Sequence, residues 1–150
     1  RQGWLLGVLA LGLLMACGGE SQPLGEPLFI DTADTRHEFV IEIAITTEQR
    51  SQGLMFRTEL AVNGGMLFQY GEPQIINMWM ANTLIPLDMI FIGTNGRIVS
   101  ISERTVPESR ATIQSEAPAI AVLEVVGGTA DRLEISPGDT VIHHFFGNAD

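Results

Sequence analysis

The sequence predicts a mainly β fold: a single compact β-sandwich or barrel, jelly-roll-like, with one or two short helices. Two observations lead to this prediction. About seven short apolar runs are separated by turn signals, and several of these runs alternate with the period of a strand. The chain also has 150 residues, of which 45% are hydrophobic and 17% charged, so it has the composition of a folded protein and the length for one core.

The first long strand is expected over residues 39–46, because every second residue from Phe39 to Ile45 is large and apolar. A short helix should follow it. Thr46 and Gln49 have the spacing of a capping box, in which each side chain binds the backbone N–H of the other residue. Gly53 should end this helix after little more than one turn.

Two breaks divide the middle of the chain. The apolar runs 65–70 and 74–80 are separated by Gly71-Glu72-Pro73, which predicts a hairpin-like turn. The second break, Gly93-Thr94-Asn95-Gly96, lies between two further apolar runs. Asn-Gly in such a position is the strongest short-range hairpin signal in the sequence.

The last third of the chain continues the same pattern. Residues 120–126 form a β-branched run and predict a strand, and residues 127–135 have room for one helical turn. Pro137-Gly138-Asp139 should turn the chain into a last strand at 140–146. Because no internal repeat or second core interrupts this series, residues 28–150 are predicted to form one domain.

The N-terminus carries a targeting signal. The stretch from Trp4 to Ala16 is 13 residues long and uncharged, which is short for a membrane span of roughly 20 residues and typical of a signal peptide. It ends in Leu14-Met15-Ala16-Cys17, which resembles a lipobox. Residues 1–16 are therefore expected to be a signal peptide, with Cys17 as the lipid attachment site. An uncleaved anchor, or a buried helix with an ordinary core cysteine, remain the alternatives.

A flexible linker is expected after the lipidated cysteine, so that residues 17–27 form the tether. Residues 18–27 are rich in glycine, proline and polar side chains, and as a coil they would reach roughly 20 Å. The chain is therefore expected to be exported and lipid-anchored to the cell envelope. Gly18 follows the cysteine where an aspartate would favour the inner membrane, so the outer membrane is favoured if the organism has one.

Net charge limits the partners of the domain. Eighteen acidic residues face eight basic ones, which gives a formal net charge of −10. Such a surface repels phosphate backbones, so no nucleic acid partner is expected. It also repels anionic headgroups, so contact with a membrane has to come through the lipid on Cys17.

Six segments of the chain form a recognisable pattern: Glu42-Ile43-Ala44, Arg50 to Arg57, Gly65 to Phe68, Trp79 to Asp88, Leu123-Glu124 and Gly138-Asp139. Together they resemble the domain-of-unknown-function 192 (DUF192) family. The resemblance covers roughly residues 39–142 and is most specific where Trp, Met, Asn, Thr, Ile, Pro, Leu and Asp recur in a fixed string. It implies a compact β-sandwich found in bacteria and archaea and often exported, and it implies no established activity, catalytic residue or cofactor.

Two carboxyl groups are predicted to lie on apolar strand faces. Asp88 shares its face with Ile90 and Ile92, and Glu124 lies between Val122 and Val126. A buried carboxylate is costly unless it is paired or hydrogen-bonded. Arg50, Arg57 and Asn82 are the available partners. These residues form either a polar site for proton transfer or ligand binding, or a structural Arg–carboxylate network that fixes a loop over the sheet.

Trp79, Asn82 and Thr83 lie where a strand is expected to give way to a loop. An indole ring that stacks, beside amide and hydroxyl groups that fix orientation, is typical of a surface that holds a sugar ring. The alternative is a core tryptophan beside a turn held by Asn and Thr side chains.

No metal or cofactor is predicted. His143 and His144 are adjacent in an expected strand, so their side chains should point to opposite faces and cannot easily share a metal ion. Met78 and Met80 fall on one strand face, and thioethers select Cu(I), but core packing is the better account of them, because methionine commonly fills gaps in a core.

These features predict a binding or accessory module of the cell envelope rather than an enzyme. Its ligand would be a carbohydrate, another small molecule or a protein of the envelope. One alternative is a hydrolase that uses Asp88 and Glu124, if the two carboxyl groups share an open cleft. Another is a protein-interaction or assembly factor, which an exposed apolar patch would favour.

Overall fold

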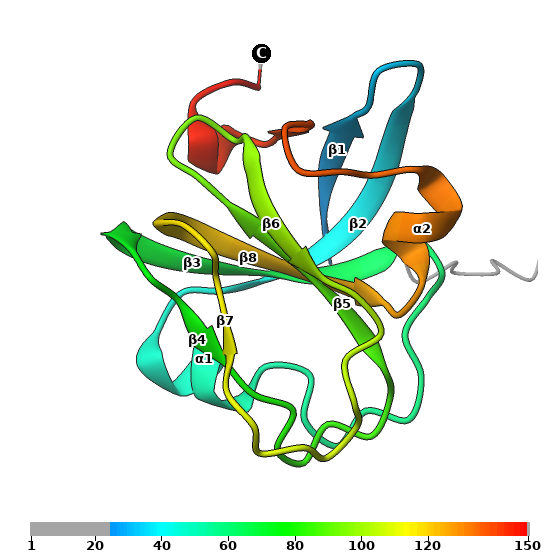
Figure 1. Ribbon diagram of the computed structural model, residues 1–150, viewed down its shortest axis with the longest axis vertical. Coiled ribbons are helices and arrows are strands. Elements are labelled where there is room, and N and C mark those ends of the chain that lie inside the picture. Colours follow the sequence, from blue (N-terminus) through cyan, green and yellow to red (C-terminus); the bar gives the residue numbers. More distant parts are fainter. Residues whose placement is uncertain (1–24, 150) are drawn as a thin grey trace, which may run out of the picture.

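The computed structural model describes residues 25–149. Most of this part of the chain forms one seven-stranded sheet with the strand order β6-β5-β8-β3-β2-β1-β9 (Figure 1). A second sheet contains two short strands, and three short helical segments lie between or after the strands. The strands are β1 (Glu26–Asp31), β2 (Arg36–Ala44), β3 (Gly64–Gln74), β4 (Asn77–Met78), β5 (Leu87–Ile92), β6 (Ile98–Ser102), β7 (Ile113–Gln114), β8 (Ala119–Val126) and β9 (Thr140–Ile142), and the helices are α1 (Thr47–Gln52), α2 (Thr129–Leu133) and the 3-10 helix η1 (His144–Phe146).

The large sheet curls until its two edges meet. Each pair of neighbouring strands is antiparallel except β2 and β3, which are parallel and are joined by a crossover that contains α1. At the edges, the Ile98 N–H donates to the Asp139 carbonyl at 2.9 Å and the Val141 N–H to the Gly96 carbonyl at 2.7 Å. The prediction of a compact, mainly β sandwich or barrel with two short helices is thereby confirmed, with one curled sheet forming the barrel.

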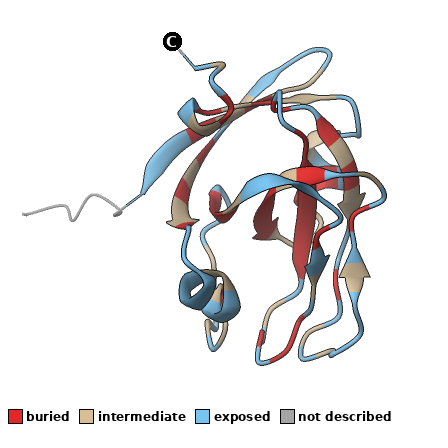
Figure 2. Ribbon diagram, turned by 90° about the vertical axis from the view of Figure 1, so that its left-hand side faces the viewer, coloured by how far each residue is buried: buried red, intermediate tan, exposed pale blue. Residues whose placement is uncertain are grey.

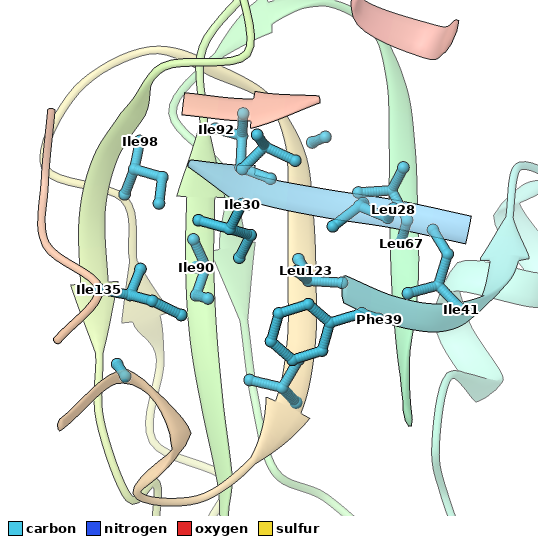
Figure 3. Close-up of a cluster of buried hydrophobic side chains, with 14 of the residues drawn as sticks. Leu28, Ile30, Phe39, Ile41, Leu67, Ile90, Ile92, Ile98, Leu123 and Ile135 are labelled. Atoms are coloured by element: carbon cyan, nitrogen blue, oxygen red, sulfur yellow. The ribbon is translucent and has the colours of Figure 1, made fainter. Parts of the chain in front are cut away.

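The sheet has an apolar cluster on each face, because side chains of period two alternate between the faces. The inner cluster contains Ile90 of β5 and Leu123 of β8 and is packed by β1, β2 and β9 (Figure 3). The outer cluster contains Met89 and Val122 from the same two strands. Leu54, Ile76 and Met80 cover the outer cluster from the segments around α1 and β4. The central strands are accordingly buried over most of their length, as Figure 2 shows.

Three local predictions are confirmed. The capping box of Thr46 and Gln49 begins α1, and the Gly53 N–H closes the helix on the Gln49 carbonyl. The Asn95-Gly96 turn joins β5 to β6 as an antiparallel hairpin. Residues 127–135 contain α2, as expected.

Two other local predictions are wrong. Gly71-Glu72-Pro73 does not end a strand, because β3 runs on to Gln74, which still pairs with Ala119 of β8. The turn residues instead form an irregular widening, in which β3 advances five residues from Gln69 to Gln74 while β8 advances two. The last strand stops at Ile142 rather than Phe146, because the backbone turns at His143 into η1.

The predicted signal peptide at 1–16, Cys17 and the residues up to 24 lie outside the described part of the chain. The linker was expected to run to Pro27, but Glu26 and Pro27 already belong to β1. Among the helices at residues 25–149, none has the length and apolar character to cross a bilayer.

Candidate functional site

A cavity of about 280 Å³ lies on the outer face of the sheet, between α1, β3, β4 and β8. We call it the α1 cavity. Four of the seven residues predicted for a ligand or polar site line it, and Asn82, Asp88 and Arg57 do not. The side chains that the following paragraphs use are Arg50, Tyr70, Met78, Trp79, Thr83 and Glu124.

Glu124 forms the floor of the α1 cavity. It lies at the centre of β8, directly between Met66 of β3 and Met89 of β5, and only 4% of its surface is exposed. Its carboxyl group makes no hydrogen bond with any residue from 25 to 149. Burial raises the pKa of Glu124 to about 8. At neutral pH it is therefore a neutral acid that can both donate and accept a hydrogen bond at the cavity floor.

Arg50 forms the wall on the side of α1. Its Nη1 donates to the Gln69 carbonyl at 2.9 Å and also to the Ile45 carbonyl, so the last turn of α1 is joined to β3. Its guanidinium carbon lies 4.7 Å from the centroid of the Tyr70 ring. Nε and Nη2 donate to no described residue. The arginine therefore presents a positive charge and spare donors beside the cavity.

Tyr70 lies within electrostatic reach of both groups. Burial raises the pKa of its phenol, the charge of Arg50 acts in the opposite direction, and the charge of Glu124 adds to the rise. Its hydroxyl contacts the sulfur of Met78 at 3.6 Å. Sequence reasoning missed Tyr70. The signal that could have found it is strand alternation, which places Met66, Phe68 and Tyr70 on the face of β3 that Glu124 shares.

The structure separates the predicted sugar-binding trio. Trp79 lies at the rim of the α1 cavity with 53% of its surface exposed, and Thr83 lines the cavity wall with its hydroxyl donated to the Ala81 carbonyl at 3.3 Å. Asn82 does not line the cavity, although its Nδ2 contacts the sulfur of Met55, a lining residue, at 3.9 Å. It has a positive φ of 55°, and its carbonyl accepts the Phe56 N–H at 2.8 Å. It therefore shapes the turn and joins two loops.

Asp88 lies on the opposite face of the sheet from Glu124. In the register of β5 and β8, Asp88 pairs with Val125 and Glu124 pairs with Met89, so the two carboxyl groups point to different sides. Asp88 is fully buried and accepts three backbone N–H groups, from Arg104 at 2.8 Å, Gly128 at 2.9 Å and Ala130 at 2.8 Å. It joins α2 to the loop after β6. The two carboxyl groups therefore do not share the single cleft that the hydrolase alternative needs.

Arg57 belongs to a separate ion pair. Its two terminal nitrogens donate to the two carboxylate oxygens of Glu42, at 2.7 and 2.8 Å. This hydrogen bonding lowers the pKa of Glu42. Both side chains are about 40% exposed, so the pair contributes modestly to stability. The expected network that joins Arg50 and Arg57 to Asp88 and Glu124 does not form.

The structure also corrects the prediction for the two histidines. His143 Nε2 and His144 Nδ1 both approach one oxygen of Glu26, at 3.2 and 3.5 Å, because the turn into η1 brings the two rings to the same side. The three groups are close enough to hold a metal ion. His143 Nδ1, however, accepts the Phe145 N–H at 3.2 Å, which leaves the ring proton on the Nε2 that faces Glu26. The hydrogen bond between His143 and Glu26 therefore joins β1 to the residue that begins η1.

Burial lowers the pKa of His143, and the charge of His144 lowers it further, while Glu26 acts in the opposite direction. At neutral pH His143 is therefore neutral, in agreement with its role as donor to Glu26 and acceptor from Phe145. Glu124 differs from His143, because its carboxyl group has no hydrogen-bond partner in the described part of the chain. Of these two buried titratable residues, only Glu124 faces a cavity.

These observations define a small β-barrel domain with a ligand-sized cavity on its outer face. The DUF192 family model, described as "Uncharacterized ACR", matches residues 29–143. The chain therefore belongs to the DUF192 family, as the residue strings of the sequence indicate. No curated protein matches it.

Two solved structures are similar to this chain. One is described as a "putative transcription regulator" from Sinorhizobium meliloti 1021, with 43% sequence identity and a TM-score of 0.78 over 79% of this chain and 93% of that one. The other is a protein of unknown function from Novosphingobium aromaticivorans DSM 12444, with 40% identity and a TM-score of 0.78 over 81% of this chain and 90% of that one. Both are similar over almost the whole of the described domain.

Proposed function

We propose that this protein is a lipid-anchored binding module of the cell envelope, and that its α1 cavity binds an envelope carbohydrate. One observation carries the proposal. A neutral carboxyl group without a partner in the described chain lies at the floor of a cavity, and a half-exposed tryptophan lies at the rim. A buried polar group is normally hydrogen-bonded, and an exception calls for a ligand or a water molecule.

The lining suits a sugar ring. The exposed face of Trp79 can stack on the apolar face of the ring, and the neutral Glu124 can donate to one hydroxyl group and accept from another. Hydrolysis by the usual route needs two carboxyl groups about 5–9 Å apart. Because Asp88 lies on the other face, the proposal is for binding without cleavage.

The cellular location in this proposal rests on the sequence. The apolar stretch before Cys17 is typical of an exported lipoprotein, and the outer membrane is favoured by Gly18. The net charge of −10 also speaks against nucleic acid as a partner. The regulatory role in the description of the Sinorhizobium protein is therefore not transferred to this chain.

The test measures the melting temperature of the full chain in detergent with N-acetylglucosamine oligomers, N-acetylmuramic acid and peptidoglycan fragments. A ligand at 100 times its dissociation constant stabilises the folded state by about 2.7 kcal/mol. Trp79→Ala and Glu124→Ala should abolish the shift. Phe56→Ala is the matched control, because Phe56 is an aromatic residue with 67% exposure that does not line the cavity. No shift with any probe, or a shift that both cavity variants retain, would overturn the proposal.

A role as a protein-interaction or assembly factor is the second candidate, and one observation favours it. Phe56, Leu84 and Val106 are exposed on three loops that hydrogen bonds join, from Phe56 N–H to Asn82 and from Glu108 N–H to Thr83. Photo-crosslinkers placed at positions 56 and 106 in intact cells would join one defined envelope protein if this surface is functional. Absence of such a product, with sugar binding intact, would reject it.

A further inference from the structure

We propose that the α1 cavity selects a carboxylate-bearing sugar over its neutral counterpart, with Arg50 and Glu124 as the two groups that recognise the carboxylate. This inference rests on the proposed carbohydrate function and names the class of ligand. It comes from two hydrogen-bond donors among the residues that line the cavity, Arg50 and Glu124.

The first donor is the arginine. Arg50 uses Nη1 for two backbone carbonyls, and this fixes the plane of its guanidinium group against Tyr70. Its Nε and Nη2 donate to no residue in the described range, although the side chain lines the cavity. A guanidinium group held in one orientation is well suited to pair with a carboxylate.

The second donor is the floor of the cavity. Burial raises the pKa of Glu124 to about 8, so at pH 7 the group carries a proton and can donate it to a ligand oxygen. An O–H group that donates to a carboxylate forms a short, charge-assisted hydrogen bond. A protonated carboxyl group is thus complementary to a carboxylate, whereas an ionised one would repel it.

The charge balance favours a carboxylate over a phosphate. Arg50 is the one cation among the residues that line the cavity, and the protein as a whole carries a net charge of −10. One cation neutralises the single charge of a carboxylate. A phosphate monoester carries about −1.5 to −2 at pH 7 and would leave excess negative charge in a small cavity.

The decisive experiment compares two sugars that differ by one carboxylate-bearing group. N-acetylmuramic acid is N-acetylglucosamine with an added lactyl group, so their affinities for the full chain can be compared by titration calorimetry. We expect N-acetylmuramic acid to bind at least tenfold more tightly at pH 7. Arg50→Gln should bring this ratio close to one. Arg57→Gln is the matched control, because Arg57 is paired with Glu42 outside the cavity, and should leave the ratio unchanged.

The pH dependence of binding tests the role of Glu124 directly. Besides Glu124, the titratable or charged residues that line the cavity are Arg50 on α1 and Tyr70 on β3, and β4 with the loop to Thr83 supplies none. Burial raises the pKa of Tyr70 above its usual value, so Glu124 is the group that titrates between pH 7 and 9. Affinity for N-acetylmuramic acid should fall about tenfold across this interval. The Glu124→Gln variant keeps a hydrogen-bond donor that does not titrate. Its affinity for N-acetylmuramic acid should change by less than twofold across the same interval.

The outcomes separate this inference from the proposed function. Equal affinity for the two sugars, independent of pH, would overturn carboxylate selection and leave carbohydrate binding in place. D-lactate, which is the carboxylate-bearing part alone, is the third probe. Binding of D-lactate with the expected pH dependence, but of neither sugar, would support the recognition of carboxylate and reject the carbohydrate. Absence of binding by all three would overturn both.

Discussion

Asp88 and Glu124 are buried carboxyl groups on adjacent strands, and they differ in their hydrogen-bond partners. The two oxygens of Asp88 accept three backbone N–H groups, so its buried polar atoms are hydrogen-bonded. Glu124 has an apolar neighbour on each side in the sheet and no hydrogen-bond donor in the described chain, so burial keeps it protonated. The first arrangement serves the fold, and the second leaves a group available for a ligand.

Replacement of Asp88 by Asn should lower the free energy of unfolding by about 2 kcal/mol. The amide keeps one acceptor oxygen, but its NH2 group would face a backbone N–H donor and leave that donor unpaired. Urea denaturation measures the change. Asp131→Asn is the control, because the Asp131 side chain is 68% exposed in its ion pair with Arg104, and it should cost less than about 1 kcal/mol. Equal losses for the two variants would contradict the role assigned to Asp88.

Glu124 should make the stability of the protein fall with rising pH. Between the usual pKa of 4.5 and the folded-state value of about 8, the folded chain holds a proton that the unfolded chain has lost, so the free energy of unfolding decreases as pH rises. The decrease is at most about 1.4 kcal/mol per pH unit. Denaturation of wild type and Glu124→Gln from pH 5 to 9 isolates this contribution. Parallel curves for the two proteins would show that Glu124 titrates normally.

At the scale of the elements, the β5–β6 hairpin also closes the barrel. Gly96 has a φ of +81°, and a Cβ atom there would meet the Val141 carbonyl oxygen and lie 2.6 Å from Asn148 Nδ2. The turn that the sequence predicts as a simple hairpin thus packs directly against β9. Only glycine combines the left-handed conformation with this close approach.

Replacement of Gly96 by Ala should cost at least about 2 kcal/mol, from backbone strain and from the displaced edge of β9. Gly71→Ala is the matched control within the widened part of β3, because a Cβ atom at Gly71 would have no atom within 4 Å. It should change stability by no more than about 0.5 kcal/mol. Thermal denaturation of both variants checks this. If Gly96→Ala leaves the stability unchanged, other contacts hold the two edges of the sheet together.

At the scale of the whole molecule, the proposal joins an acidic barrel to a lipid tether. The negative charge of the domain offers no attraction to anionic headgroups, so the proposed membrane attachment would depend on the lipid. A mature lipoprotein carries more than one acyl chain, which gives stable anchoring. The segment between Cys17 and β1 would hold the domain within roughly 20 Å of the headgroups.

Cys17→Ser should release the protein from the membrane fraction without changing its folding. The variant should appear in the soluble envelope fraction, with a circular dichroism spectrum like that of the wild-type domain. The comparison uses salt and carbonate washes of membranes from both strains. If the variant stays with the membranes after the washes, the stretch from Trp4 to Ala16 is an uncleaved anchor and the lipoprotein proposal fails.

Local features of the chain could be predicted because a few neighbouring residues decide them. Residues that are close in sequence decide three of these features. They are the capping box of Thr46 and Gln49, the Asn95-Gly96 hairpin and the strand at 119–126. Period-two alternation likewise indicated that Asp88 and Glu124 are buried. Local patterns failed at Gly71-Glu72-Pro73, where pairing of Gln74 with Ala119 overrides the turn signal.

The sequence by itself determined the mainly β class, the membership of the DUF192 family and the burial of the two carboxyl groups. The tertiary structure decided which face each group occupies, because a shift of one residue in register would exchange the faces. It also decided that Arg50 meets the cavity while Arg57 pairs with Glu42, and that Glu26 meets His143 across 117 positions. These contacts depend on the closure of the whole sheet, which no short stretch of sequence encodes.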